Sequence, residues 1–144
     1  MNEILLTLCS PLAQLRIEED DYLERPDVSS RAIYIVGNYE GFICLCHILL
    51  YIANEAESSV EITTLPFIKN MTGLPIFVRS YFSEDNEWGK NGFIDKTDKN
   101  ITWKLGEENA AQAASLIHGL GYSWEHLHFD AKEKTQLSLF MAIE

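Results

Sequence analysis

Residues 32–53, AIYIVGNYEGFICLCHILLYIA, constrain the fold more than any other stretch of this chain. The β-branched and aromatic residues 33–36 favour a strand that is covered on both faces. Gly37 permits an unusual backbone angle, and the Asn38 side chain can cap a helix by accepting a hydrogen bond from a free backbone amide. Between residues 42 and 53 the one clearly polar side chain is His47, which predicts a helix buried in the centre of the fold. This helix is too short to cross a bilayer, which needs about 20 apolar residues.

The whole chain is predicted to form one α+β domain, residues 1–144, in which a mainly antiparallel sheet packs against two helices, at about residues 40–55 and 107–119. A chain of 144 residues with 47% hydrophobic residues is long enough to bury a core of its own. Residues 92–95 and 101–105 predict a hairpin. Further strands are predicted at residues 3–8, 12–17, 59–64, 74–82, 124–129 and 136–143.

Two stretches of the chain share the order strand, turn, helix, strand: residues 33–63 and residues 101–129. Gly37 and Gly106 occupy corresponding places when the two are compared. A duplicated unit would produce this pattern, and so would one local solution that is used twice. Because the identity between the stretches is low, the sequence favours the second interpretation.

The chain carries a formal net charge of −11, from 22 acidic and 11 basic residues. This balance argues against nucleic acid and against a membrane surface as partners, since both need a positive footprint. It is compatible with a basic protein partner, although acidity also serves solubility. The opening residues lack the positive charge and the long apolar run of an export signal. Cys9, Cys44 and Cys46 have no CxxC spacing, and we expect them to be reduced core residues of a cytoplasmic protein.

Acidic residues cluster in two predicted loops, at residues 18–30 and 83–91. Such clusters are commonly just solvated, but if the two met in space they would form an anionic face able to steer a basic partner. Trp88 lies in the second loop, where it could either anchor an interface or fold back onto the sheet. The predicted partner-binding residues are Glu18, Glu19, Asp20, Asp21, Glu84, Asp85, Glu87 and Trp88.

His126 and His128 lie two residues apart on a predicted strand, which places them on one face roughly 7 Å apart. Two zinc ligands can have this spacing, with Asp130, His47 or His118 as a third. Nothing else in the sequence has metal-ligand spacing, so the two histidines are weak candidates and no metal site is predicted. No serine or cysteine lies in the context of a catalytic nucleophile, and no glycine-rich phosphate loop is present. The sequence therefore predicts no catalytic and no cofactor-binding residues.

The strand, the GN-x-E-G-F turn, the apolar helix and the late HxHFD strand together resemble a family of small immunity proteins from bacterial polymorphic and contact-dependent toxin systems. The resemblance covers about a third of the chain, and its matching positions are Gly37, Asn38, Gly41, Phe42, His126, His128, Phe129 and Asp130. It implies a non-catalytic protein that binds and neutralises one cognate toxin in the cytoplasm of the producing cell. Many such toxins are basic nucleases, which would suit the acidic charge.

Two other classes of function stay open from the sequence. One is a metal-dependent or small-molecule enzyme built around His126, His128 and Asp130, for which the zinc content of the purified protein is the discriminating measurement. The other is an adaptor subunit of a constitutive complex, which would co-purify with one stoichiometric partner and without toxicity. The sequence does not predict the oligomeric state.

Overall fold

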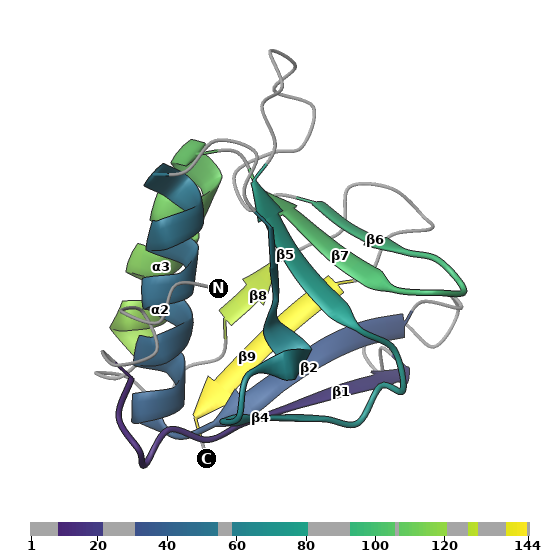
Figure 1. Ribbon diagram of the computed structural model, residues 1–144, viewed down its shortest axis with the longest axis horizontal. Helices are drawn as coiled ribbons and strands as arrows, with labels where there is room; N and C mark the ends of the chain where they lie inside the picture. The colour runs from purple at the N-terminus through teal and green to yellow at the C-terminus, as the bar shows by residue number, and fades with distance from the viewer. Residues whose placement is uncertain are drawn as a thin grey trace.

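The computed structural model describes residues 9–21, 31–54, 59–80, 93–105, 107–120, 127–129 and 138–143. Within these residues the chain forms a small α+β fold, as the sequence predicts, with two sheets and two helices (Figure 1). The helices α2 (Tyr39–Asn54) and α3 (Glu107–Leu120) pack side by side along one side of the sheets. Their observed bounds agree closely with the two predicted helices. In the described part of the chain, neither helix is both long and apolar enough to span a membrane.

The first sheet has five strands, in the order β4 (Ile68–Asn70), β1 (Leu15–Asp21), β2 (Arg31–Gly37), β9 (Ser138–Ile143) and β8 (Leu127–Phe129). The second sheet has four strands, in the order β3 (Ser59–Glu61), β5 (Ile76–Ser80), β7 (Ile101–Leu105) and β6 (Phe93–Lys96). A short 3-10 helix, η1 (Ile62–Thr64), follows β3. The predicted hairpin is confirmed as the antiparallel pair of β6 and β7.

Both sheets are mixed, which corrects the prediction of a mainly antiparallel sheet. The pairs β1–β4, β2–β9 and β5–β7 are parallel. Parallel neighbours need a crossover connection, because a tight turn can join only antiparallel strands. The hydrophobic pattern of a sequence shows which residues form strands, but it does not show which strands become neighbours.

Three predicted strands also differ in extent or lie outside the described residues. β1 continues through Asp21, so it includes residues that we expected in the acidic loop 18–30. Its pairing with all of β2 outweighs the low strand propensity of acidic side chains. The strand predicted at residues 59–64 ends at Glu61, where η1 begins. The strand predicted at residues 3–8 lies outside the described part of the chain.

The two sheets are built from two similar units that exchange strands. Each unit contains a hairpin, a helix and a second antiparallel pair: β1, β2, α2, β3 and β5 in the first unit, and β6, β7, α3, β8 and β9 in the second. Each sheet combines the first hairpin of one unit with the second strand pair of the other, joined by the parallel pairs β2–β9 and β7–β5. β4 is an addition of the first unit at the edge of the first sheet.

One offset along the chain relates the middle parts of the two units, in which β2, α2 and β3 correspond to β7, α3 and β8. Ile33 corresponds to Ile101, and the first residues of the helices, Tyr39 and Glu107, are separated by the same 68 positions. With this offset, the buried positions of α3 all match buried positions of α2: Ala110, Ala113, Ala114 and Ile117 match Phe42, Leu45, Cys46 and Leu49. Gly37 then corresponds to Leu105 rather than to Gly106. This agreement favours a duplicated unit. The sequence alone had favoured the other interpretation, one local solution that is used twice.

The core lies between the sheets and under α2. Ile17 and Ile33 of the first sheet and Val78 of the second are at most 3% exposed. The prediction that the apolar helix is buried in the centre is confirmed, because five of its large side chains are at most 1% exposed: Phe42, Leu45, Ile48, Leu49 and Ile52. Small residues of α3 let the helices approach closely, and the Cys46 Sγ donates a hydrogen bond to the Ala114 carbonyl oxygen at 3.2 Å.

The cysteines differ from the prediction that all of them are reduced. Cys9 and Cys44 are joined by a disulfide, with Cα atoms 5.2 Å apart, a usual separation for such a bond. The prediction is therefore wrong for this pair, which the sequence could not reveal because spacing alone does not determine connectivity. Cys46 has a free, buried thiol, and burial raises its pKa to about 12. A thiol that stays protonated at neutral pH is a poor nucleophile.

Candidate functional site

The turn that leads into α2 is organised by the side chain of Asn38. Its Oδ1 accepts hydrogen bonds from the backbone amides of Gly41, at 2.8 Å, and Gln14, at 2.9 Å. Its Nδ2 donates to the Leu12 carbonyl oxygen at 2.6 Å. The bond from Gly41 is the helix cap that the sequence predicts. The other two attach residues 12–14 to the start of the helix.

Two glycines of this turn leave room for the attached segment. A Cβ atom at Gly41 would lie 2.6 Å from the Gln14 carbonyl oxygen, and one at Gly37 would come closer still to the same atom. Side-chain rotation cannot relieve these contacts, because the Gln14 atom that would clash with the new Cβ belongs to the backbone. Phe42, which follows, is 1% exposed. The GN-x-E-G-F turn, residues 37–42, therefore has a structural role in this chain.

A surface groove of about 660 Å³ lies next to this turn, between the starts of β1 and β4 and the end of β2. Its lining is partly apolar, with Pro11, Pro66 and Phe67, and partly cationic, with Arg16 and Lys69. The two cationic residues are direct neighbours in the β1–β4 pair. A concave surface of this mixed character suits an anchoring side chain of a protein partner.

The acidic residues of β1 divide between the two faces of the strand. Alternation places Glu18 and Asp20 on the outer face with Arg16, whose Nε lies 2.5 Å from the Glu18 Oε1. The Glu18 side chain is 39% exposed and Asp20 is exposed. Arg16 also lines the groove, so the groove and the exposed carboxylates adjoin each other along β1. Of Asp21, the structure describes only the backbone, at the end of β1.

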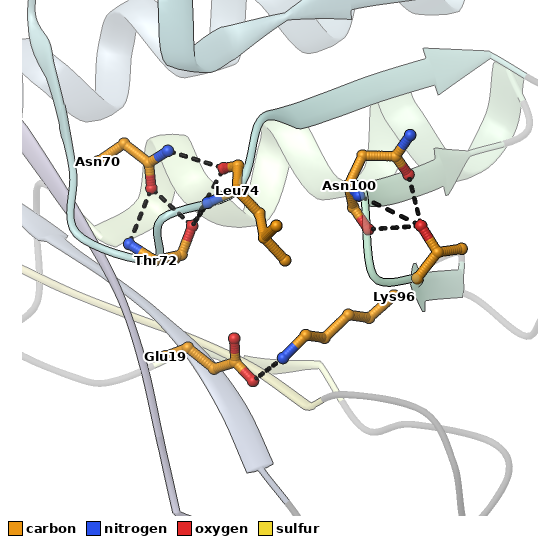
Figure 2. Close-up of polar contacts among 7 residues, drawn as sticks. Glu19, Asn70, Thr72, Leu74, Lys96 and Asn100 are labelled. Atoms are coloured by element: carbon orange, nitrogen blue, oxygen red, sulfur yellow. Dashed lines mark hydrogen bonds and ion pairs between the residues drawn. The ribbon is translucent and has the colours of Figure 1, made fainter.

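Glu19 is on the inner face of β1 and forms an ion pair between the sheets. Its side chain is 7% exposed, and its Oε1 accepts a hydrogen bond from the Lys96 Nζ of β6 at 2.6 Å (Figure 2). Glu19 and Lys96 are equivalent by strand pairing, because they lie opposite Ile33 and Ile101, which correspond in the two units. Cys46 and Ala114 also correspond, and they touch as well. Contacts between equivalent positions are expected along a two-fold axis. Glu19 thus joins the two halves of the fold.

Figure 2 also shows the turn between β4 and β5, where Asn70 and Thr72 bond to each other and to the backbone of Leu74. Gly73 in this turn has a φ of +78°, a left-handed conformation that glycine adopts without strain. This turn directs the chain from the edge of the first sheet into the second.

The other predicted site residues are not brought together by the described structure. Glu84, Asp85, Glu87 and Trp88 lie outside the described residues, so the meeting of the two acidic clusters stays a prediction. His126 and Asp130 also lie outside them, and of His128 and Phe129 only the backbone, in β8, is described. Within the described ranges, no group of three or more His, Cys, Asp or Glu residues is arranged to hold a metal ion.

No protein-family model matches this chain, and no curated protein matches it.

The Glu19–Lys96 pair leads to a prediction for stability. Lys96→Met should lower the free energy of unfolding by about 1–3 kcal/mol, because it leaves a nearly buried carboxylate without its cation. Lys99→Met, at an exposed lysine of the same hairpin, is the matched control and should change it by less than about 0.5 kcal/mol. Urea denaturation measures both. The double variant Glu19→Lys/Lys96→Glu should recover part of the loss. Equal stability of Lys96→Met and Lys99→Met would contradict the role of the pair.

Proposed function

We propose that this protein is a non-catalytic immunity protein that binds and neutralises a cognate bacterial toxin. The observation that carries the proposal is the outer face of the first sheet, where the exposed carboxylates of Glu18 and Asp20 adjoin a groove of about 660 Å³. Protein interfaces commonly combine such an anchor site with a polar, charged surround. The net charge of −11 and the partial resemblance to immunity proteins support the same conclusion.

A basic toxin, such as a nuclease that binds phosphates with cationic side chains, is the partner that the net charge of −11 suits best. Glu18 and Asp20 would attract its cations before contact, and the groove beside Phe67 would receive an apolar side chain. Nucleic acid and anionic membranes are not proposed as partners, because a chain of charge −11 repels both. The proposed location is the cytoplasm of the producing cell. Disulfides are rare there, so the Cys9–Cys44 bond is the observation that stands against this location.

Charge reversal should distinguish an effect of the acids on the outer face of β1 from an effect of the net charge of the chain. Glu18→Lys/Asp20→Lys is expected to slow association with the toxin domain about tenfold at low salt and to weaken the salt dependence of the rate, because charged rims mainly affect association. Glu61→Lys/Asp98→Lys changes the net charge by the same amount elsewhere on the chain and should slow association less than about threefold. Stopped-flow binding measures both variants. Equal effects would show that the outer face of β1 is not the contact surface.

Co-expression with the toxin domain encoded by the neighbouring reading frame tests the function itself. We expect cells to survive only when this protein is present, and the two proteins to purify as a stoichiometric complex. We also expect the toxin to be recovered chemically unchanged from the complex, since the proposed action is binding alone. Cells that die equally fast with and without this protein, with no complex formed, would rule the proposal out.

A further inference from the structure

The groove beside β1 is a positively charged place on a strongly acidic chain. Lys69, Arg16 and Val36 lie in one row across β4, β1 and β2, where Arg16 is the direct neighbour of both others. Of the described residues that line the groove, none is Asp or Glu. In a chain with 22 acidic and 11 basic residues, this local excess of positive charge favours an anionic occupant.

The charge of Lys69 is not neutralised by the part of the chain that the structure describes. Lys69 is exposed, and no ion pair joins it to another described residue. Arg16, in contrast, shares its charge with Glu18, which lies 2.5 Å from it. On the second sheet Lys104 is also the direct neighbour of an arginine, but there the Asp95 Oδ2 lies 3.7 Å from the lysine Nζ. The groove is therefore the better site for an anion from outside.

Apolar side chains make up much of the remaining lining. Pro11 and Pro66 are exposed, and Phe67 is half-buried two positions before Lys69. The volume of about 660 Å³ lies within the range of about 300–1,000 Å³ that is typical of ligand sites. A small inorganic anion would leave most of this apolar surface in water. The lining therefore suits an occupant that combines a negative charge with an apolar body.

We propose that this groove binds a carboxylate of the protein partner, presented beside an apolar side chain of that partner. The Lys69 ammonium and the Arg16 guanidinium contact the carboxylate, and Phe67 contacts the apolar side chain. That the carboxylate belongs to a toxin rests on the proposed function, whereas the preference of the groove for a carboxylate does not.

The acids further along β1 define a charge pattern that the partner has to match. Glu18 and Asp20 are two and four residues from Arg16 on the same face, which is about 7 Å and about 13 Å along the strand. A matching partner therefore places its cations at these distances from its carboxylate. A partner with the opposite order of charges would set like charges against each other at each of these positions, which lowers the affinity.

The test without a toxin uses phenylpropionate, a small carboxylate with an aromatic ring, and its uncharged analogue phenylpropanamide. NMR titration of the intact, isotope-labelled protein should show saturable shifts of the backbone amide signals of residues 12–16 and 67–69. We expect phenylpropionate to bind at least about threefold more tightly than phenylpropanamide, because charge-assisted hydrogen bonds are stronger than neutral ones. Equal binding of the two compounds, or no binding of phenylpropionate, would overturn the proposal. Inorganic phosphate that binds as tightly as phenylpropionate would overturn it as well.

Lys69→Met removes one positive charge from the groove and keeps an apolar side chain there. It should weaken the binding of phenylpropionate at least about threefold and leave that of phenylpropanamide unchanged. Lys104→Met is the matched control, because it removes a lysine with a neighbouring arginine from the second sheet, and it should change neither. The NMR spectra also show whether each variant is folded. Equal weakening by the two variants would mean that only the net charge matters, which would overturn the proposal.

Binding of the toxin domain separates this inference from the proposed function. Lys69→Glu should speed dissociation of the complex about tenfold, because it sets a like charge against the partner's carboxylate in the groove, and Lys104→Glu should not. If both variants dissociate at the wild-type rate, the inference is wrong and the proposed function stands. If no toxin binds but phenylpropionate is still preferred over phenylpropanamide, the proposed function is wrong and the preference of the groove stands.

Discussion

Leu49→Ala is expected to lower the free energy of unfolding by about 2–5 kcal/mol, the range for truncation of a large side chain in a packed core. Leu49 is 0% exposed, in the middle of α2, and its equivalent on the neighbouring helix is the buried Ile117. α2 packs against α3 and against strands of the second sheet, so several elements would have to shift to fill the cavity. The loss should therefore fall well above the typical effect of a point substitution, which is about 1 kcal/mol.

The adjacent residue supplies the control for this prediction. Leu50→Ala is the same substitution one position along the same helix, but Leu50 is 42% exposed and should lose less than about 1 kcal/mol. Urea denaturation of both variants measures the difference. Equal losses would show that α2 is not the centre of the core.

Gly41→Ala should destabilise the fold by about 1–3 kcal/mol, the typical cost of inserting an atom where there is no room for it. The new Cβ would lie 2.6 Å from the Gln14 carbonyl oxygen, so the segment of residues 12–15 must move. That movement would also weaken the hydrogen bonds by which the Asn38 side chain holds Gln14 and Leu12. The thermal midpoint and the urea midpoint should both fall.

Gly119→Ala is the matched change in the other helix, and it should act in the opposite direction. A Cβ at Gly119 has no neighbour within 4 Å, and alanine forms helices better than glycine by up to about 1 kcal/mol. The pair separates helix propensity from crowding, because propensity alone predicts a gain at both positions. A higher free energy of unfolding in both variants would mean that the segment of residues 12–15 can move away from the new Cβ atom at little cost.

The strand, turn and helix at residues 32–53 could be predicted because their determinants are local. The β-branched run, the Asn38 cap and the uninterrupted apolar positions all act within a few residues of one another. β2 and α2 follow this pattern closely. The hairpin of β6 and β7 and the helix α3 were predicted for the same reason.

Features that depend on distant parts of the chain could not be predicted. Glu19 was grouped with Glu18 and Asp20 as an exposed acid, but strand alternation turns it towards Lys96, 77 residues later in the sequence. The groove beside β1 combines residues 11–16, 36–38 and 66–69, which only the sheet topology brings together. For the candidate site, therefore, the sequence indicated Glu18 and Asp20 as exposed acids, but neither the groove nor the cations Arg16 and Lys69 beside them.

The exchange of strands between the units has a consequence for synthesis on the ribosome. β9 lies between β2 and β8 in the first sheet, yet residues 138–143 are translated long after β2 (Figure 1). Until they emerge, the edge of β2 that later pairs with β9 has no partner in that sheet, and such open edges favour wrong pairing and aggregation. We therefore expect that a nascent chain of this protein folds correctly only if residues 31–37 stay shielded until residues 138–143 have been made.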